Sequence, residues 1–387
     1  LLMSANLCSA LMNNVTDCDE TYNYWEPLHH LLYGEGFQTW EYSPVYAIRS
    51  WAYICLHSML TWAHLGFLNE NKLLVFYFIR MIFGLVCTLC EIQFYKGVSL
   101  RFGNNVARIL LALMVLGTGM FISSTAFLPS TFCMFGTFLF MGLWLQEKLN
   151  LAILTVAASA IIGFLIDTVT IATLQKLYGF FKFHRYLSVQ WIAALVLTIY
   201  GVISLSRSFA LFNAYHGSME LYPKLHHIAD KADTSETTVR VCMGKEWHRF
   251  PSSFLLPNNF TLELIRSEFK GQLPAKFEAP GLEGTRAEPR HFNDENLEEK
   301  SRYVDVETCH FLIDFNHGEE STHEPIYSQQ QDNWKILKEV DFLISKKSTS
   351  SLHRAFFVPF YFYERNDFGK YQLLQSRTNL LKRKPDS

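Results

Sequence analysis

The chain has 387 residues, of which 49% are hydrophobic, 15% aromatic and only 18% charged. A length of this order accommodates two or three domains, and the shortage of charge relative to ordinary soluble proteins favours a membrane protein. The formal net charge of −2 argues against a nucleic-acid-binding protein, which would carry a basic surface.

The composition is uneven along the chain. Long apolar runs dominate residues 1–210, whereas residues 213–387 have the mixed charges and turn residues of a soluble domain. The change falls at Leu205–Ser208. We therefore predict a mainly α membrane protein in which a multi-span helical domain (residues 1–210) precedes a soluble α/β domain (residues 213–387).

Apolar runs that could cross a membrane follow one another through the first domain. A membrane-spanning helix needs about 20 apolar residues, and Leu73–Tyr95 is the clearest such run, with Arg80 and Glu91 as its only charges. Val45–Leu68 contains aromatic, histidine and arginine residues, so we expect an interfacial or re-entrant helix there. The other candidate spans are Ile109–Leu128, Phe132–Gln146, Leu151–Leu174 and Leu187–Leu205.

Charge asymmetry and glycosylation sequons predict an orientation. Three basic residues follow Leu73–Tyr95, and loops rich in Lys and Arg stay in the cytosol. The acidic segment 14–72 then faces the lumen, where sequons are used. Asn14 begins one sequon in that segment, and Asn259 begins another in the soluble domain. The three basic residues are Lys96, Arg101 and Arg108.

Counting the spans forward leads to a contradiction. If every run crosses fully, the basic loop between Leu151–Leu174 and Leu187–Leu205 lies in the lumen, although its charge is typical of a cytosolic loop. The soluble domain with Asn259 would then face the cytosol. We expect that Leu151–Leu174 does not cross cleanly, or that an odd number of spans is absent near Gly163–Asp167.

The segment from Asp17 to Tyr42 gathers carboxylates and aromatic rings at a membrane boundary. Acids in such a place are costly unless they are solvated or functional. A sugar site needs this combination, because carboxylates accept hydroxyl protons and aromatic rings pack against the apolar faces of sugars. Helix-capping boxes at Thr16–Asp19 and Asp17–Glu20 would explain some of the acids, and an interfacial belt would explain single aromatic residues.

Asp17-Cys18-Asp19 also has the Asp-x-Asp pattern that holds a metal ion under nucleotide sugars. Nothing else in the sequence indicates a nucleotide-binding fold, and a three-residue match is common by chance. We therefore expect no metal site and no cofactor.

Several motifs resemble glycosyltransferase family 22 and, within it, the Alg9-type α-1,2-mannosyltransferases. The likeness lies in both halves of the chain, first in the acidic segment and then in the soluble domain. The matching stretches are Asp19-Glu20, Tyr24–Pro27, Gly34–Pro44, Phe127–Ser130, Ser206–Ser208, Tyr215–Gly217, Gly244–Trp247, Arg249–Phe254 and Gly271–Pro274.

This resemblance implies a GT-C fold and a multi-pass enzyme of the endoplasmic reticulum membrane, with the soluble domain in the lumen. The implied reaction adds α-1,2-linked mannose from dolichyl-phosphate mannose to a dolichyl-pyrophosphate-linked oligosaccharide in N-glycan precursor assembly. The partners would be these two lipid-linked substrates and membrane lipid, with no nucleic acid. Conversion of a β-linked phosphomannose into an α-linkage requires inversion, for which one general base suffices. The sequence does not predict the oligomeric state.

The family pattern centres on the Asp19-Glu20 pair, and we expect Asp19 to be the general base, with Glu20 as the alternative. His29 and His30 are expected to be helix-face residues at an interface. Acidic and aromatic neighbours would shape the sugar sites, and basic side chains, selected by type alone, would bind the phosphate of the donor. The expected substrate-binding residues are Glu26, Trp40, Glu41, Tyr42, Arg49, Lys245 and Arg249.

The sequence departs from the family in one region. The family motif His-Lys-Glu-Glu-Arg-Phe is absent, and the chain passes from Ala158–Gly163 almost directly to the basic stretch Leu174–Arg185. An internal deletion is the simplest explanation, and a start without Met indicates a truncated N-terminus. The alternative function is therefore an inactive isoform that binds glycans or partners at the membrane. A transporter would explain the spans but not the acidic segment.

The soluble domain is expected to be mixed α/β. A helix is predicted at Leu221–Ala232, and residues 275–300 are expected to form a loop. Cys242 and Cys309 could form a disulfide in an oxidising lumen or remain as two buried thiols, and the other six cysteines show no metal-ligand spacing. The β-like runs are Val239–Met243, His310–Phe315 and Ala355–Phe360.

Overall fold

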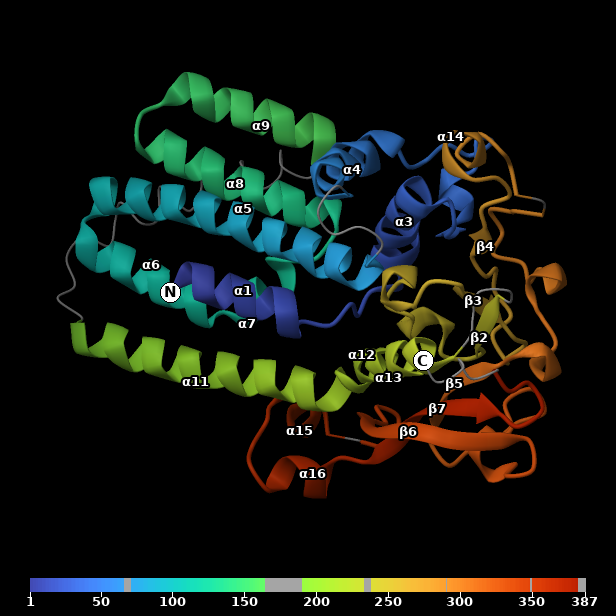
Figure 1. Cartoon of the computed structure of the whole chain (residues 1–387). Helices are drawn as coiled ribbons and strands as arrows, with labels where there is room; N and C mark the ends of the chain where they lie inside the picture. The colour runs from blue at the N-terminus through green and yellow to red at the C-terminus, as the bar shows by residue number, and fades with distance from the viewer. Residues whose placement is uncertain (66–70, 164–189, 233–237, 290, 349, 382–387) are drawn as a thin grey trace. The chain divides into compact units, whose positions relative to one another are not determined.

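The computed structural model (Figure 1) divides the chain into two compact units. Unit 1 comprises Leu1–Asn13 and Tyr77–Phe209, and unit 2 comprises Asn14–Phe76 and Ala210–Ser387. The acidic segment thus belongs to the same unit as the C-terminal half of the chain. The structure describes residues 1–65, 71–163, 190–232, 238–289, 291–348 and 350–381.

Unit 1 is built from helices. Among them, α8 and α9 pack along each other. The first residues of α5 and the last residues of α11 belong to unit 2. The helices are α1 (Leu2–Met12), α5 (Lys72–Phe102), α6 (Asn104–Leu116), α7 (Thr118–Ser123), α8 (Pro129–Leu145), α9 (Leu149–Gly163) and α11 (Gln190–Tyr215).

Within the described residues, two helices are long and apolar enough to cross a membrane, judged by length and composition: Lys72–Phe102 and Leu195–Tyr215. The predicted helical run Leu73–Tyr95 is confirmed inside α5. The structure does not contain one continuous helix over Ile109–Leu128, and a membrane crossing by this stretch remains a prediction. Gly117, with ψ of 119°, separates α6 from α7, and Leu128 is extended before Pro129, as proline requires of the residue that precedes it.

Other predicted spans differ in their bounds. The helix expected over Val45–Leu68 is α4, which begins only at Trp51, and Phe132–Gln146 lies almost wholly within α8. The second half of Leu151–Leu174, the basic loop after it and the irregular stretch Gly163–Asp167 lie outside the described residues, except for Gly163.

The two charges of α5 are satisfied by α1. Arg80 donates from Nη2 to the carbonyl oxygens of Ser9 (3.3 Å) and Asn13 (2.7 Å) at the C-terminal end of α1, where a cation interacts favourably with the helix dipole. Glu91 accepts a hydrogen bond of 2.8 Å from Asn6. These contacts explain how an otherwise apolar helix accommodates buried ionisable groups.

In unit 2 the acidic segment folds into short helical pieces. Asp17 accepts a hydrogen bond from the backbone of Asp19 and so caps the first helix, as the capping pattern predicts. Gly34 ends α3 with φ of +79°, a left-handed conformation that glycine adopts without steric cost. The pieces are α2 (Cys18–Glu20), a π-helical turn (Thr21–Trp25), α3 (Glu26–Tyr33), β1 (Phe37–Gln38), a 3₁₀ turn (Trp40–Tyr42) and α4 (Trp51–Leu65).

The C-terminal half of unit 2 contains a five-stranded mixed sheet in the order β3-β2-β5-β7-β6. Strand β2 runs parallel to β3 and β5, whereas β7 runs antiparallel to β5 and β6. Five of the six residues of β5 are buried, as expected of a central strand covered on both faces. The strands are β2 (Val239–Met243), β3 (Phe260–Leu264), β5 (Phe311–Asn316), β6 (Trp334–Leu343) and β7 (Phe368–Ser376).

A second, small sheet joins the two sequence segments of unit 2. Strand β1 of the acidic segment pairs antiparallel with β4 (Ala275–Lys276), so that Phe37 lies opposite Lys276. This pairing brings residues 272–274, which precede β4, close to the acidic segment. The remaining helices of this unit are α12 (Gly217–Glu220), α13 (Tyr222–Lys231), α14 (Gly281–Gly284), α15 (Ser351–Ala355) and α16 (Tyr361–Arg365).

The expected elements of the C-terminal half are largely present. The strands at Val239–Met243 and His310–Phe315 are confirmed as β2 and β5, and the helix at Leu221–Ala232 is confirmed as α13. The strand prediction for Ala355–Phe360 is wrong, since this stretch links α15 to α16. Pro359 lacks a backbone donor, and the stretch has no place in the sheet order.

Cys242 and Cys309 form a disulfide, so the pairing alternative is the one that the structure contains. It links β2 to the residue that precedes His310 and β5. The prediction of a membrane domain over residues 1–210 and a soluble domain over 213–387 remains a prediction, because compactness alone does not locate a membrane.

Candidate active site

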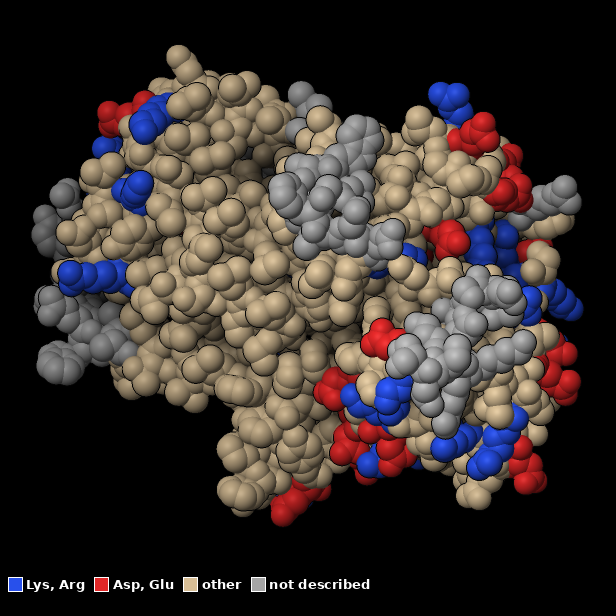
Figure 2. All heavy atoms as spheres, in the orientation of Figure 1, with Lys and Arg blue, Asp and Glu red and all other residues tan. Residues whose placement is uncertain are grey.

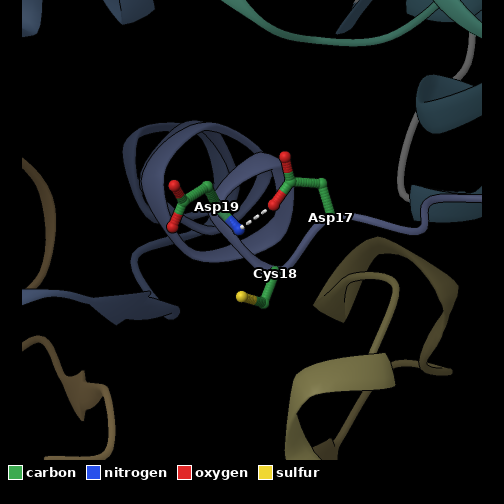
Figure 3. Close-up of side chains that lie close together, drawn as sticks. All are labelled: Asp17, Cys18 and Asp19. Atoms are coloured by element: carbon green, nitrogen blue, oxygen red, sulfur yellow. Dashed lines mark hydrogen bonds between the residues drawn. The ribbon is translucent and has the colours of Figure 1, made fainter.

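Asp19 lies exposed at the beginning of the acidic segment, on the one-turn helix α2. The cap formed by Asp17 orients this turn, since Asp17 Oδ1 accepts a 2.9 Å hydrogen bond from the Asp19 backbone (Figure 3). The π-helical turn at Thr21–Trp25 follows directly. Such turns are rare and often occur at functional sites.

A cavity of about 190 Å³ opens beside Asp19 in unit 2. One wall comes from the acidic segment, with Asp19, Asn23, Trp40 and Glu41 among its residues. The other lining residues come from the C-terminal half and include Trp247 and Asn296; they are called the C-terminal wall below. The volume is below the roughly 300–1,000 Å³ of pockets for drug-sized ligands, so the cavity suits one sugar ring rather than a long chain of sugars.

Arg49 organises the charges of the acidic wall. Its Nε donates to Glu41 Oε2 at 2.6 Å, and its Nη1 donates to the hydroxyl of Tyr24. Its Nη2 lies 4.0 Å from Asp19 Oδ2. Glu41 is therefore held in a close ion pair, whereas the side chain of Asp19 has, among the described residues, a more distant cation and a 3.4 Å hydrogen bond from Asn23.

The surroundings of Asp19 make its carboxylate more basic than an ordinary aspartate. Partial burial raises its pKa most, and the negative charge of Asp17 raises it further. Arg49 acts in the opposite direction, and Glu41 adds a smaller increase. A carboxylate that is raised in pKa and lines a cavity has the properties of a general base.

Glu20 and Glu26 lie away from the cavity. Glu20 is buried, and its Oε1 accepts a 2.9 Å hydrogen bond from the indole of Trp25. Glu26 is 0% exposed and accepts hydrogen bonds from Ser253 N (2.7 Å), Ser253 Oγ (2.8 Å), Ser252 Oγ (3.3 Å) and Phe37 N (3.2 Å). Burial raises the pKa of Glu26, and these hydrogen bonds lower it. Glu26 thus fastens the acidic segment to residues 252–253.

The two aromatic candidates, Trp40 and Tyr42, also differ in their position relative to the cavity. Trp40 lines the cavity and packs edge-to-face on Tyr46, with ring centroids 5.2 Å apart. Tyr42 is buried, and its hydroxyl donates a 2.6 Å hydrogen bond to the carbonyl oxygen of Asn23. Tyr42 therefore supports the backbone behind the cavity.

Lys245 and Arg249 are engaged in ion pairs away from Asp19. Lys245 Nζ lies 3.3 Å from Asp314. Arg249 Nη1 donates to both carboxylate oxygens of Glu246, at 2.8 and 2.6 Å, and its guanidinium lies over the ring of Phe342 at 4.8 Å. In the matching stretch that contains Lys245, Gly244–Trp247, it is Trp247 that lines the cavity.

The two sequons differ in exposure. Asn14 is 8% exposed, and its Oδ1 lies 2.7 Å from Nδ1 of His216. Asn259 is exposed at a turn with φ of +64°, immediately before β3. Use of either sequon remains a prediction.

Among the described residues, Asp17, Cys18 and Asp19 place one potential ligand atom each within 4.8 Å of one another (Figure 3). Burial raises the pKa of the Cys18 thiol, and the charges of Asp19 and Asp17 raise it further. A thiol that keeps its proton is a poor metal ligand. The expectation of no metal at this group remains a prediction.

The cavity includes residues to which the sequence pattern assigns no role. Gln272 lies in Gly271–Pro274, one of the stretches that resemble the family, and this membership is the sequence feature that could have identified it as a site residue. Asn296 lies in the predicted loop 275–300, where no pattern singled it out. Its Oδ1 accepts a 2.8 Å hydrogen bond from Gln272 N, which joins the two loops of the C-terminal wall.

The model of the Alg9-like mannosyltransferase family matches residues 1–186 and 164–257. The mouse and human proteins named alpha-1,2-mannosyltransferase ALG9 are each 35% identical to this chain over 539 aligned positions, which cover 97% of the chain and 88% of the relative. The protein of that name from Saccharomyces cerevisiae is 24% identical over 89% of the chain and 88% of its own length. None of the solved structures matches the chain significantly.

These alignments contain a large internal gap. The 539 aligned positions exceed the 387 residues of this chain by 152, so at least 152 residues of the mouse relative have no counterpart here. The two segments matched by the family model meet at residues 164–186. This position agrees with the deletion expected after Gly163.

Proposed function

The chain belongs to the Alg9-like mannosyltransferase family, and we propose that it adds α-1,2-linked mannose from dolichyl-phosphate mannose to a dolichyl-pyrophosphate-linked oligosaccharide. The observation that carries this proposal is the position of Asp19. Of the two neighbouring acids, Asp19 lines the cavity with a raised pKa, whereas Glu20 is buried against Trp25.

In the proposed reaction, Asp19 accepts the proton of the acceptor 2-hydroxyl as the hydroxyl oxygen attacks C1 of the donor mannose. The new bond joins that oxygen to C1, and the bond from C1 to the phosphate oxygen breaks on the opposite face. Dolichyl phosphate leaves with the electron pair, so the configuration at C1 inverts. A positioned base of this kind contributes a factor of about 10²–10⁴ to the rate.

The cavity walls support binding of a sugar ring. Trp40 and Trp247 line the cavity with aromatic rings, and Asn23 and Asn296 line it with amide groups that suit sugar hydroxyls. Arg49 holds Glu41 in place and contributes positive charge 4.0 Å from Asp19. A binding role for Lys245 and Arg249 has no support from the geometry, because both cations are already paired with carboxylates.

The proposed location is the endoplasmic reticulum membrane. The helices α5 and α11 are candidate spans, and the mouse and human relatives bear the name of an α-1,2-mannosyltransferase. In this proposal the acidic segment and the soluble C-terminal domain face the lumen, and the shorter apolar helices complete a multi-pass topology of the GT-C type. Use of an exposed sequon at Asn259 would fit this orientation.

A second candidate function is favoured by the internal gap. A chain in which at least 152 residues of the mouse relative have no counterpart could keep the sugar-binding cavity and lose transfer. It would then act as a membrane-bound protein that binds glycans or partners.

A transfer assay separates the two functions. The full chain in detergent receives radiolabelled dolichyl-phosphate mannose and the lipid-linked acceptor, and the product is digested with an α-1,2-specific mannosidase. Release of labelled mannose supports the enzyme. If no transfer occurs but a chimaera that carries the intervening segment of the mouse relative is active, the chain itself is the inactive form.

A further inference from the structure

An aromatic loop, defined here as Ala355–Tyr363, joins α15 to α16 in unit 2. Its nine residues carry no charge, and six of them are Phe or Tyr. Several of these side chains point outward: Phe360 is 85% exposed, Tyr361 59% and Tyr363 52%. A soluble protein rarely concentrates large apolar side chains on its surface without a binding partner.

The backbone at the tip of the loop is strained. Phe360 has φ of +68° and ψ of −52°, and the backbone N–H of Tyr361 donates to the carbonyl oxygen of Pro359 at 2.9 Å. This is a γ-turn of the rare type with positive φ. A bulky residue held in such a conformation and exposed to this extent indicates that its presentation has a function.

The loop is anchored on the C-terminal end of α11. Phe362, which is 1% exposed, packs with Ala210, Ala214 and Leu343. The hydroxyl of Tyr363 donates a 2.8 Å hydrogen bond to Asn213. Residues 210–215 are the last residues of the candidate span Leu195–Tyr215. The aromatic loop therefore packs beside the end of this candidate span.

The charge distribution agrees with this placement. In Figure 2, charged side chains gather over the strands of the sheet, whereas the lobe formed by α15, α16 and the aromatic loop is almost free of them on the side that faces the viewer. Charges resume at Glu364 and Arg365, immediately after the loop. An uncharged aromatic surface with a charged border is typical of proteins that rest in a membrane interface.

We propose that the aromatic loop inserts into the lipid interface and anchors unit 2 beside the membrane end of α11. The occupant is the phospholipid headgroup and upper acyl-chain region, because the loop exposes one apolar Phe and two amphipathic Tyr rings beside the end of a candidate span. The inference rests on α11 crossing the membrane, as proposed above, and not on mannosyl transfer.

Photolabelling from lipid tests this anchor. The full chain is reconstituted in phosphatidylcholine vesicles that contain a phosphatidylcholine with a diazirine on its acyl chain, illuminated, digested and mapped by mass spectrometry. We expect adducts on the peptide that contains Phe360 and on peptides of α5 and α11. The internal reference is the peptide around Leu282 in α14, whose side chain is also exposed and should remain almost unlabelled.

A matched pair of variants completes the design. The double variant Phe360→Ser with Tyr361→Ser should reduce labelling of the loop to the level of the Leu282 peptide, with α5 and α11 still labelled, whereas Leu282→Ser should change nothing. Thermal unfolding of both variants in detergent should match that of the parent, because these side chains are exposed. Three outcomes would each overturn the proposal. The parent loop could be labelled no more than the Leu282 peptide, the loop could cross-link to a second copy of the chain, or α11 could remain unlabelled. No outcome depends on whether mannose is transferred.

Discussion

Asp19 and Glu20 are adjacent in the sequence, but one helical turn places their carboxylates in different environments. Asp19 is exposed to the cavity beside Asp17 and Arg49, whereas Glu20 is enclosed with the indole of Trp25. A general base must reach the substrate before its pKa matters. Local helix geometry therefore distinguishes two acids that the sequence alone ranks only by resemblance.

The charge of Asp17 should set the acid limb of the pH profile. Asp17 raises the pKa of Asp19, so the Asp17→Asn variant should have a base with a lower pKa. Its kcat/KM should persist to a lower pH than that of the parent, with little loss at neutral pH, because asparagine caps a helix as well as aspartate does. An acid limb that does not move, or moves to higher pH, would contradict this electrostatic role.

Glu26 should stabilise the fold rather than bind sugar. Its carboxylate accepts from four donors in a fully buried site, and Glu26→Gln replaces one acceptor by a donor that faces other donors. We expect a loss of about 1–3 kcal/mol in the free energy of unfolding, the usual cost of unsatisfied buried polar groups. Chemical denaturation in detergent measures it. The exposed Glu35→Gln is the control, and equal stability of both variants would refute the assignment.

At the scale of elements, helix α3 is held by neutral histidines. His29 Nδ1 lies 2.6 Å from the carbonyl oxygen of Glu35, and His30 stacks on Phe277 with ring centroids 3.7 Å apart. Burial, followed by the charge of Lys72, lowers the pKa of His29 to about 3, and the hydrogen bond to the carbonyl oxygen of Glu35 acts in the opposite direction. These residues pack α3 against its neighbours in unit 2, as expected for helix-face histidines.

The stability of unit 2 should therefore fall in mild acid. Below about pH 6.5, the ordinary pKa of histidine, the unfolded chain binds a proton at His29 that the folded chain does not bind until about pH 3. In this range, each histidine that is protonated only in the unfolded chain lowers the free energy of unfolding by up to about 1.4 kcal/mol for every unit by which the pH falls. His29→Gln should flatten the dependence between pH 6 and 4, and the exposed His227→Gln should not. Equal slopes in both variants would refute this explanation.

The disulfide should matter more than any single strand contact in the sheet. Cys242 and Cys309 are 67 residues apart, and closure of a loop of this size stabilises a fold by up to about 4 kcal/mol in the chain-entropy account. The double variant Cys242→Ala with Cys309→Ala should lose about 2–4 kcal/mol in thermal unfolding. Replacement of the exposed Cys55 by Ser is the control. A double variant as stable as this control would show that the cross-link contributes nothing.

Sequence patterns over a few neighbouring residues predict those elements whose structure depends mainly on these residues. The capping role of Asp17, the apolar run of α5 and the β-branched run of β2 all appear where the sequence indicates them. The strand prediction for Ala355–Phe360 is wrong because a high aromatic content is typical of strands. In the structure, Pro359 and the packing of Phe362 instead favour a connection between α15 and α16. The C-terminal wall of the cavity could not be predicted, since Asn296 reaches it through the long-range pairing of β1 with β4.

At the scale of the whole molecule, the acidic segment folds with the C-terminal half rather than standing alone. The β1–β4 pairing and the hydrogen bonds of Glu26 connect residues more than 200 positions apart. The cavity needs both segments, and the two stretches matched by the family model meet between them in the sequence, at residues 164–186. The residues that line this cavity therefore lie on both sides of that meeting point, while at least 152 residues of the mouse relative have no counterpart in the chain.

The most direct test compares mannosyl transfer by the parent chain with that of Asp19→Asn and Asp17→Asn, under saturating dolichyl-phosphate mannose and acceptor. We predict a loss of about 10²–10⁴-fold in kcat for Asp19→Asn, the contribution of a general base, with near-parental kcat for Asp17→Asn and unchanged thermal unfolding of both. An Asp19→Asn enzyme as active as the parent would contradict the proposal that this carboxylate is the base.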